Sequence, residues 1–94
     1  MNNEEAIQLL ERELLGFRDE SYTDLVGRIP AGSLDYQRSA AGGVKYQLEI
    51  QFIWDDRPGG NIRVMGSIDD GGWRAFLPLS RSFIKSADGS FVGD

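Results

Sequence analysis

The 94-residue chain contains no cysteine and no histidine. Without cysteine it has no disulfide, no thiol nucleophile and no thiolate ligand for zinc or iron–sulfur clusters. Without histidine it lacks the commonest general base and metal ligand, so no serine has a histidine to activate it. Its two lysines, Lys45 and Lys85, lie in extended segments on the expected wet side, which does not suit Ser–Lys chemistry. We therefore expect no enzymatic activity and no catalytic, cofactor-binding or metal-binding residues.

Long apolar runs are also missing, since none approaches the eighteen residues that a membrane-spanning helix needs. The chain begins Met-Asn-Asn-Glu-Glu, which is acidic where a secretory signal is basic, and no apolar segment follows. These features predict a cytoplasmic protein with no membrane contact. The length predicts a single domain over residues 1–94, with a helical part at about 3–27 and a β part at about 33–93.

The formal net charge of −5 is distributed unevenly. Residues 1–24 contain seven acidic residues against Arg12 and Arg18, whereas residues 25–94 contain eight acidic and eight basic residues. Such a chain repels a phosphate backbone, so we expect no nucleic-acid partner. A basic protein is the better match for this charge.

The clearest pattern is the strict alternation of apolar and polar residues over positions 44–54. A period of two places alternate side chains on opposite faces, which predicts an antiparallel strand with one buried and one wet face. The residues expected on its inner face are Val44, Tyr46, Leu48, Ile50, Phe52 and Trp54.

Residues 3–16 have the spacing of an amphipathic helix, with Asn2 or Asn3 capping its start and Gly16 at its end. Its expected buried stripe is Ala6, Ile7, Leu10, Leu14 and Phe17. Four carboxylates on it have no basic residue three or four positions away, namely Glu4, Glu5, Glu11 and Glu13. Intrahelical pairs therefore do not neutralise them. They either meet arginines elsewhere in the fold or form an acidic surface.

Residues 21–24 have the pattern of a capping box, which predicts a short second helix ending near Gly27. Residues 33–39 are predicted to form the first strand. Loops rich in aspartate and glycine follow at 55–60 and 69–72. Because the two aspartate pairs close opposite ends of one strand, roughly 20 Å apart, they form turns and do not share a metal ion.

The two loops set the register between three strands if their inner faces match. The expected opposite pairs are Trp54 with Ile62, Phe52 with Val64, Ile68 with Trp73, Gly66 with Ala75 and Val64 with Leu77. Gly66 is then the point where the helix lies closest to the sheet. The whole pattern predicts an α+β fold: one or two N-terminal helices packed on one face of a four- to five-stranded antiparallel β-meander.

The same register gathers large apolar residues on the outer face of the sheet. They are Ile53, Met65 and Phe76, with the basic residues Arg63, Arg74 and Lys45 around them. A face that only meets water does not usually carry three such residues. Either the C-terminal segment covers them or they bind a partner.

These observations predict a non-catalytic protein-interaction module, whose partner is another protein or a second copy in a weak homodimer. The residues expected to bind the partner are Ile53, Met65, Phe76, Arg63, Arg74, Glu4, Glu5 and Glu11. One alternative is a small-molecule or carbohydrate binder that stacks its ligand on Trp54 or Trp73. Another follows from the acidic helix ahead of an antiparallel sheet. That layout is similar to small immunity or antitoxin-type inhibitors, which implies a basic partner.

Overall fold

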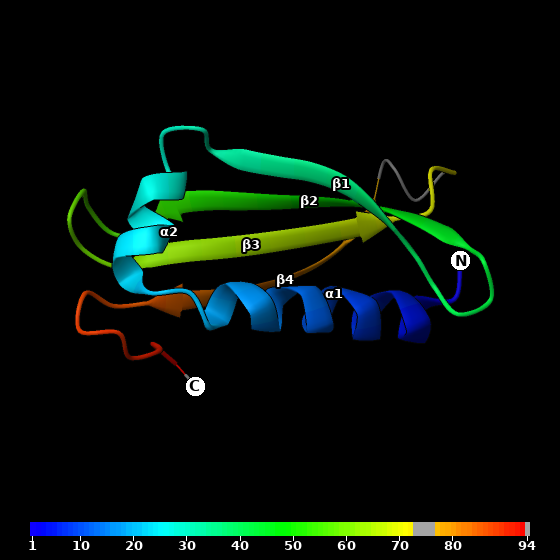
Figure 1. Ribbon diagram of the computed structural model, residues 1–94, viewed down its shortest axis with the longest axis horizontal. Helices are drawn as coiled ribbons and strands as arrows, with labels where there is room; N and C mark the ends of the chain where they lie inside the picture. The colour runs from blue at the N-terminus through cyan, green and yellow to red at the C-terminus, as the bar shows by residue number, and fades with distance from the viewer. Residues whose placement is uncertain (73–76, 94) are drawn as a thin grey trace.

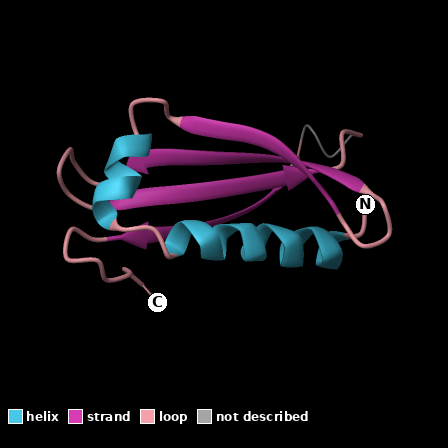
Figure 2. Ribbon diagram, in the orientation of Figure 1, coloured by secondary structure: helices cyan, strands magenta, loops and turns pink. Residues whose placement is uncertain are grey.

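Four antiparallel strands form an open sheet in their sequence order, with two helices preceding them (Figures 1 and 2). The strands are β1 (Ser33–Ser39), β2 (Lys45–Trp54), β3 (Ile62–Asp69) and β4 (Leu79–Lys85). This computed structural model describes residues 1–72 and 77–93. It confirms the predicted α+β fold. Among these residues the sheet has no fifth strand, since Phe91 makes only an isolated bridge to Lys85.

Helix α1 (Asn3–Arg18) begins where the sequence predicts. The Asn2 side chain accepts a hydrogen bond from the Glu5 backbone N–H at 3.1 Å, which satisfies one of the free donors at the helix start. The helix ends two residues later than expected. Gly16 therefore lies inside it and does not terminate it.

Helix α2 (Tyr22–Arg28) starts at the predicted capping box, because Ser21 Oγ accepts from the Asp24 N–H at 3.0 Å. Leu25 is fully buried, and the Tyr22 hydroxyl donates to the Gly60 carbonyl at 2.7 Å. These two contacts fix α2 against the core and against the loop after β2. Neither helix in the described part of the chain is long and apolar enough to cross a membrane.

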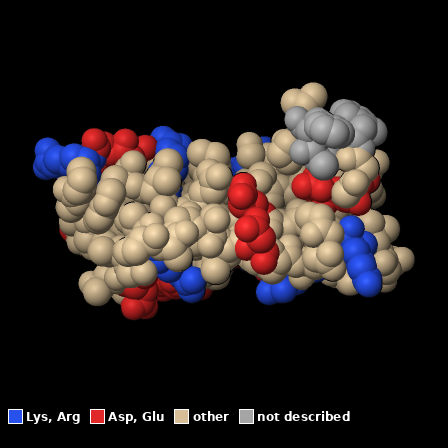
Figure 3. All heavy atoms as spheres, turned by 90° about the horizontal axis from the view of Figure 1, so that it is seen from above, with Lys and Arg blue, Asp and Glu red and all other residues tan. Residues whose placement is uncertain are grey.

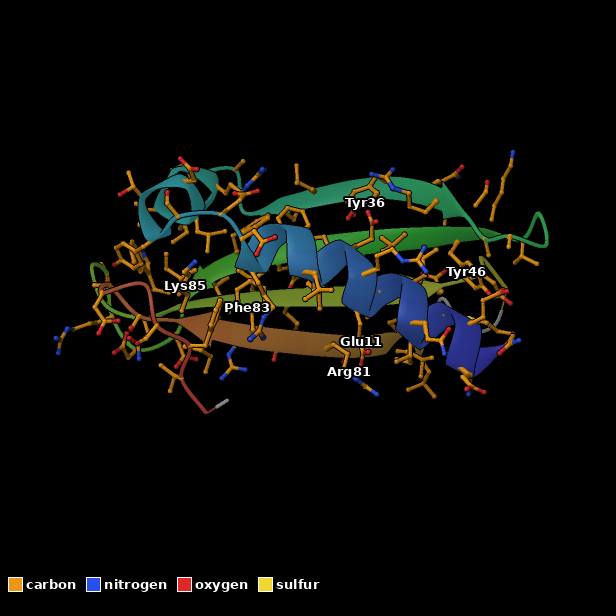
Figure 4. All side chains as sticks on the ribbon, turned by 60° about the horizontal axis from the view of Figure 1, so that its bottom comes forward. Glu11, Tyr36, Tyr46, Arg81, Phe83 and Lys85 are labelled. Carbon is orange, nitrogen blue, oxygen red and sulfur yellow. The ribbon has the colours of Figure 1, made fainter. Side chains whose placement is uncertain are left out.

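Helix α1 packs on the inner face of the sheet, over β3 and β4 (Figure 4). The helix packs directly on Gly66, where an added Cβ would lie 2.7 Å from Leu10 Cδ1 and 3.2 Å from Leu14 Cδ2. This contact is consistent with the predicted position of Gly66 beneath the helix. The buried core consists of Ala6, Leu9, Leu10, Leu14, Leu25, Tyr46, Leu48, Ile50, Phe52, Ile62, Val64, Ile68 and Phe83.

Two expectations about the core are wrong in detail. On α1, Leu9 is buried and Ile7 is only half-buried, because the helix turns its buried stripe slightly toward the Leu9 side. Val44 is 46% exposed, since β2 begins one residue after it. The other inner residues of the long strand are buried, except Trp54, which is half-buried against the core.

The predicted pairing of β2 with β3 is confirmed, with Phe52 opposite Val64. The predicted pairing beyond β3 is wrong: Val64 pairs with Phe83 and not with Leu77. Gly66 pairs with Arg81 and Ile68 with Leu79, while Trp73 and Ala75 lie outside the described residues. The reason is Pro78, which has no N–H for a sheet ladder, so β4 begins directly after it.

Lys85 is buried at 7% exposure, which corrects its expected position on the wet face. Its Nζ donates to the carbonyl oxygens of Arg18 at 3.0 Å and Glu20 at 2.6 Å. It also lies 5.1 Å from the centre of the Phe91 ring. The ammonium group thus donates hydrogen bonds to carbonyl oxygens at and just beyond the C-terminal end of α1, where a positive charge is favourable (Figure 4).

Candidate functional site

Three carboxylates of α1 have partners on the sheet, and the sequence had left this question open. The contacts are Tyr46 Oη to Glu5 Oε1 at 2.8 Å, Arg81 Nε to Glu11 Oε1 at 3.6 Å and Arg38 Nε to Glu13 Oε1 at 3.1 Å. Figure 4 shows Glu11 and Arg81 next to each other. Glu4 is exposed and makes no ion pair among the residues described. Two of the four carboxylates are therefore paired with arginines, while Glu5 accepts a hydrogen bond from a neutral phenol.

The Tyr46 hydroxyl gives a measurable pH dependence. Burial, together with the hydrogen bond to Glu5, raises the pKa of Tyr46 to about 12. Burial and the Glu13 carboxylate raise the pKa of Tyr36 to about 12 in the same way. Because both values exceed the ordinary pKa of about 10, the neutral phenols stabilise the fold below pH 10, and this stability is lost between pH 10 and 12.

We expect Tyr46 alone to account for about 2 kcal/mol of the stability lost between pH 9 and pH 12. Urea denaturation at a series of pH values measures this slope. The Tyr46→Phe variant should show a shallower decline than the parent over that range. Equal slopes for the two proteins would contradict the assignment.

On the outer face of the sheet, apolar residues surround one arginine. Ile53, Arg63 and Ile84 are successive partners across β2, β3 and β4, and Met65 lies two residues beyond Arg63. Ile53 is 42% exposed, and the other three are half-buried. We call these four residues the outer patch. Arg63 is held in place by Asp55 Oδ1, 2.9 Å from its Nε, and it donates from Nη1 to Ser82 Oγ at 3.2 Å.

The outer patch differs from the one that the sequence predicts. Met65 pairs with Ser82 on β4, so its expected pairing with Phe76 is wrong, and Ile84 lies next to Arg63. Phe76 and Arg74 themselves lie outside the described residues. Counting the alternation from the strand start after Pro78 would have placed Ile84 on this face.

At the other end of the outer face, two carboxylates lie directly opposite each other. Asp35 of β1 pairs with Glu49 of β2. Asp69 of β3 pairs with Gln47, which lies two residues before Glu49 on β2. We call Asp35, Glu49 and Asp69 the acidic row. They line an open hollow of about 450 Å³, whose remaining walls are Tyr36, Gln37, Gln47, Leu48, Ser67 and Pro78. Within residues 1–72 and 77–93, Asp35 and Glu49 make no ion pair. Sequence reasoning missed this row because Asp35 and Glu49 are neighbours only through strand pairing.

A second concave region, the α1–β1 groove, follows the inner side of β1. It consists of two hollows, of about 450 and 200 Å³, that meet at Arg12. The first is lined by Arg12, Glu13, Gly16, Phe17, Glu20, Arg28, Leu34, Tyr36 and Arg38. The second is lined by Glu5, Gln8, Leu9, Arg12, Ser39, Ala40 and Ala41. Figure 3, which looks onto the β1 side of the molecule, shows separate groups of acidic and of basic side chains on that side.

The aspartates of the loops make the hydrogen bonds of turns, as expected. Asp56 Oδ1 accepts from the N–H groups of Arg57 and Asn61, both at 2.8 Å, and these bonds lower the pKa of Asp56. Asp69 and Asp70 accept from the N–H groups of Gly71 and Gly72. In the described part of the chain, no three acidic side chains are arranged to hold a metal ion.

Comparison of the chain with protein families, curated protein sequences and solved structures gives no match. The function is therefore argued from the chain's own residues. Of the two tryptophans, Trp54 is half-buried against the core, and Trp73 lies outside the described residues. An aromatic ring packed in this way offers a ligand less stacking surface than an open one.

Proposed function

We propose that the chain is a non-catalytic, cytoplasmic protein-interaction module. Its outer sheet face would dock a protein that presents a basic strip beside an apolar one. The observation that carries this proposal is the outer face itself, where the outer patch and the acidic row occupy opposite ends. Both helices pack on the other face of the sheet.

The composition of the outer patch supports docking of a protein. Methionine and arginine are enriched at the centres of protein interfaces, and arginine is among the residues that contribute most to binding. The Arg63 guanidinium is already oriented by Asp55 and Ser82, so little side-chain freedom would be lost on binding. Ile53 and Ile84 flank it and provide the apolar contact.

The acidic row indicates the charge of the partner. Like charges directly opposite each other in an antiparallel pair destabilise a sheet, and Asp35 and Glu49 have this arrangement. A basic partner would turn that repulsion into attraction and would also suit the net charge of −5. This is the partner charge that the resemblance to immunity or antitoxin-type inhibitors implies.

A second copy of the chain fits the face less well. Stacking two complete outer faces would bring two acidic rows near each other, so only the outer patches could overlap. A specific interface needs about 1,000 Å² or more, which a contact between two such patches does not readily supply. A weak homodimer is therefore the second candidate. The small-molecule alternative has less support, because Trp54 packs against the core.

The test uses a fourteen-residue amphipathic peptide of leucine and lysine, titrated into the ¹⁵N-labelled chain. We expect saturable NMR shifts at amides of β2 and β3. The variant Asp35→Asn should bind about two- to fivefold more weakly and should be about 0.5 kcal/mol more stable, because it removes the like-charge pair with Glu49. Glu4→Gln, which removes an equal charge from α1, is the matched control and should bind like the parent.

Two results would overturn the proposal. NMR shifts confined to α1 would place binding on the helix. Equal weakening of binding by Glu4→Gln would show that the peptide responds only to the net charge of the chain. Light scattering on the free chain tests the homodimer. A concentration-dependent mass that Met65→Asp abolishes would replace the basic partner with a second copy.

A further inference from the structure

The edge of β1 is free to pair with another strand. Ala40 N donates to Val44 O at 2.8 Å and Phe52 N donates to Gly32 O at 2.9 Å, so the even-numbered residues of β1 bond to β2. The backbone groups of Asp35 and Gln37 therefore point away from the sheet. Among the described residues, only the Arg38 side chain bonds to one of them, from Nη1 to Gln37 O at 3.1 Å.

The α1–β1 groove lies directly beside this edge on the inner side. Gly16 and Phe17 line it together with Leu34, whereas Leu9 lines it together with Ala41. Across the groove, α1 and β1 therefore run in opposite directions. A strand added to β1 would direct alternate side chains into the groove, between the sheet edge and the helix.

Gly16 is the feature of the groove that the fold does not explain. Glycine is the least favourable helix residue after proline, yet Gly16 lies inside α1 with an ordinary helical backbone. An added Cβ would meet nothing within 4 Å, so packing within the described chain does not require glycine there. The missing side chain leaves room in the groove for a group from outside.

Arg12 provides a positive charge at the middle of the groove. Of the three arginines that line it, Arg28 is held by Glu20 at 2.8 Å and Arg38 by Glu13 at 3.1 Å. Arg12 makes no ion pair within the described ranges. It precedes Gly16 by four residues, a rise of about 6 Å, which matches the roughly 6.6 Å between alternate residues of a strand.

We infer that the α1–β1 groove binds an extended segment of another protein. The segment pairs with β1 as an added antiparallel strand, its apolar side chain lies over Gly16, and an acidic side chain two residues earlier meets Arg12. This site is separate from the outer face and does not depend on the function proposed for that face. The incoming strand replaces the bond from Arg38 to Gln37 O and leaves the pair of Arg38 with Glu13 in place.

The probe is the labelled peptide Thr-Val-Thr-Glu-Thr-Leu-Thr, whose valine, glutamate and leucine would point into the groove. Titration into the ¹⁵N-labelled chain should give saturable shifts at the amides of β1 and of residues 12–17. A peptide with lysine in place of glutamate should bind about two- to fivefold more weakly, and Arg12→Gln should abolish that difference. A peptide with N-methylated backbone amides should not bind, because it cannot pair with the edge.

Two glycine variants test the groove itself. Gly16→Leu fills the space beside β1 and should weaken binding at least about tenfold, while its melting temperature stays at or above that of the parent. Gly27→Leu is the matched control, since Gly27 is also inside a helix, also has nothing within 4 Å and does not line the groove. It should bind like the parent. The inference is overturned if the peptide gives no saturable shifts, if they lie outside β1 and α1, or if Gly16→Leu binds like Gly27→Leu.

Discussion

Gly66→Val is expected to destabilise the protein by about 3 kcal/mol or more. Valine favours strands, so the loss would come from packing alone. The new Cβ would lie 2.7 Å from Leu10 Cδ1 and 3.2 Å from Ile50 Cδ1, and both neighbours are fully buried. Urea denaturation followed by tryptophan fluorescence measures the change in the free energy of unfolding.

Ser67→Val is the matched control, because Ser67 is the next residue of β3 and faces the outer side. It should change stability by less than about 0.5 kcal/mol. Leu10→Ala should partly rescue Gly66→Val, since it removes the atoms that the new side chain meets. A double-mutant cycle should give a coupling of about 1–3 kcal/mol, and strict additivity would contradict the proposed clash.

Lys85→Met is expected to destabilise the protein by about 3 kcal/mol, although methionine has nearly the same shape. The substitution removes both hydrogen bonds from Nζ and leaves the carbonyls of Arg18 and Glu20 without this donor. It also removes the positive charge near the C-terminal end of α1 and above the Phe91 ring. Thermal and urea denaturation measure the loss.

The chain provides its own control in its other lysine. Lys45→Met makes the same chemical change at an exposed position of β2 and should alter stability by less than about 0.5 kcal/mol. Hydrogen exchange adds a local test, since amides in the last turn of α1 should exchange faster in Lys85→Met. A Lys85→Met protein as stable as Lys45→Met would show that water replaces the ammonium group.

The sequence predicts the first hairpin of the sheet well and the last one poorly. The alternation over 44–54 and the loop at 55–60 set the register of β2 with β3, because only one register buries both apolar faces. The second loop has equally good turn residues at 69–72, but β4 starts at Leu79. Local turn chemistry does not reveal the nine residues from 70 to 78 between the strands. The register predicted from that turn therefore put Phe76 opposite Met65, whereas Ser82 is the partner of Met65 and Ile84 is the partner of Arg63.

The candidate surfaces depend on contacts that a linear pattern does not contain. Lys85 is the clearest case, since a charged residue in an alternating strand indicates the wet face. Its burial becomes favourable only when the C-terminal end of α1 lies above β4. The significance of Gly16 was hidden in the same way. A glycine near a predicted helix end is expected to terminate the helix, and only the structure shows that the helix continues past it.

The two edges of the sheet are unequally protected, and this limits how copies of the chain could polymerise. Val92 N bonds to Ile84 O, which occupies one end of the β4 edge, whereas on the β1 edge only Gln37 O accepts a bond, from the Arg38 side chain, within the described part of the chain. Endless filaments require β1 of one copy to pair with β4 of the next, and the bonded tail shortens that pairing. Pairing of β1 with β1 consumes both open edges at once. We therefore expect edge-to-edge assembly of this fold to favour pairs of copies over long filaments.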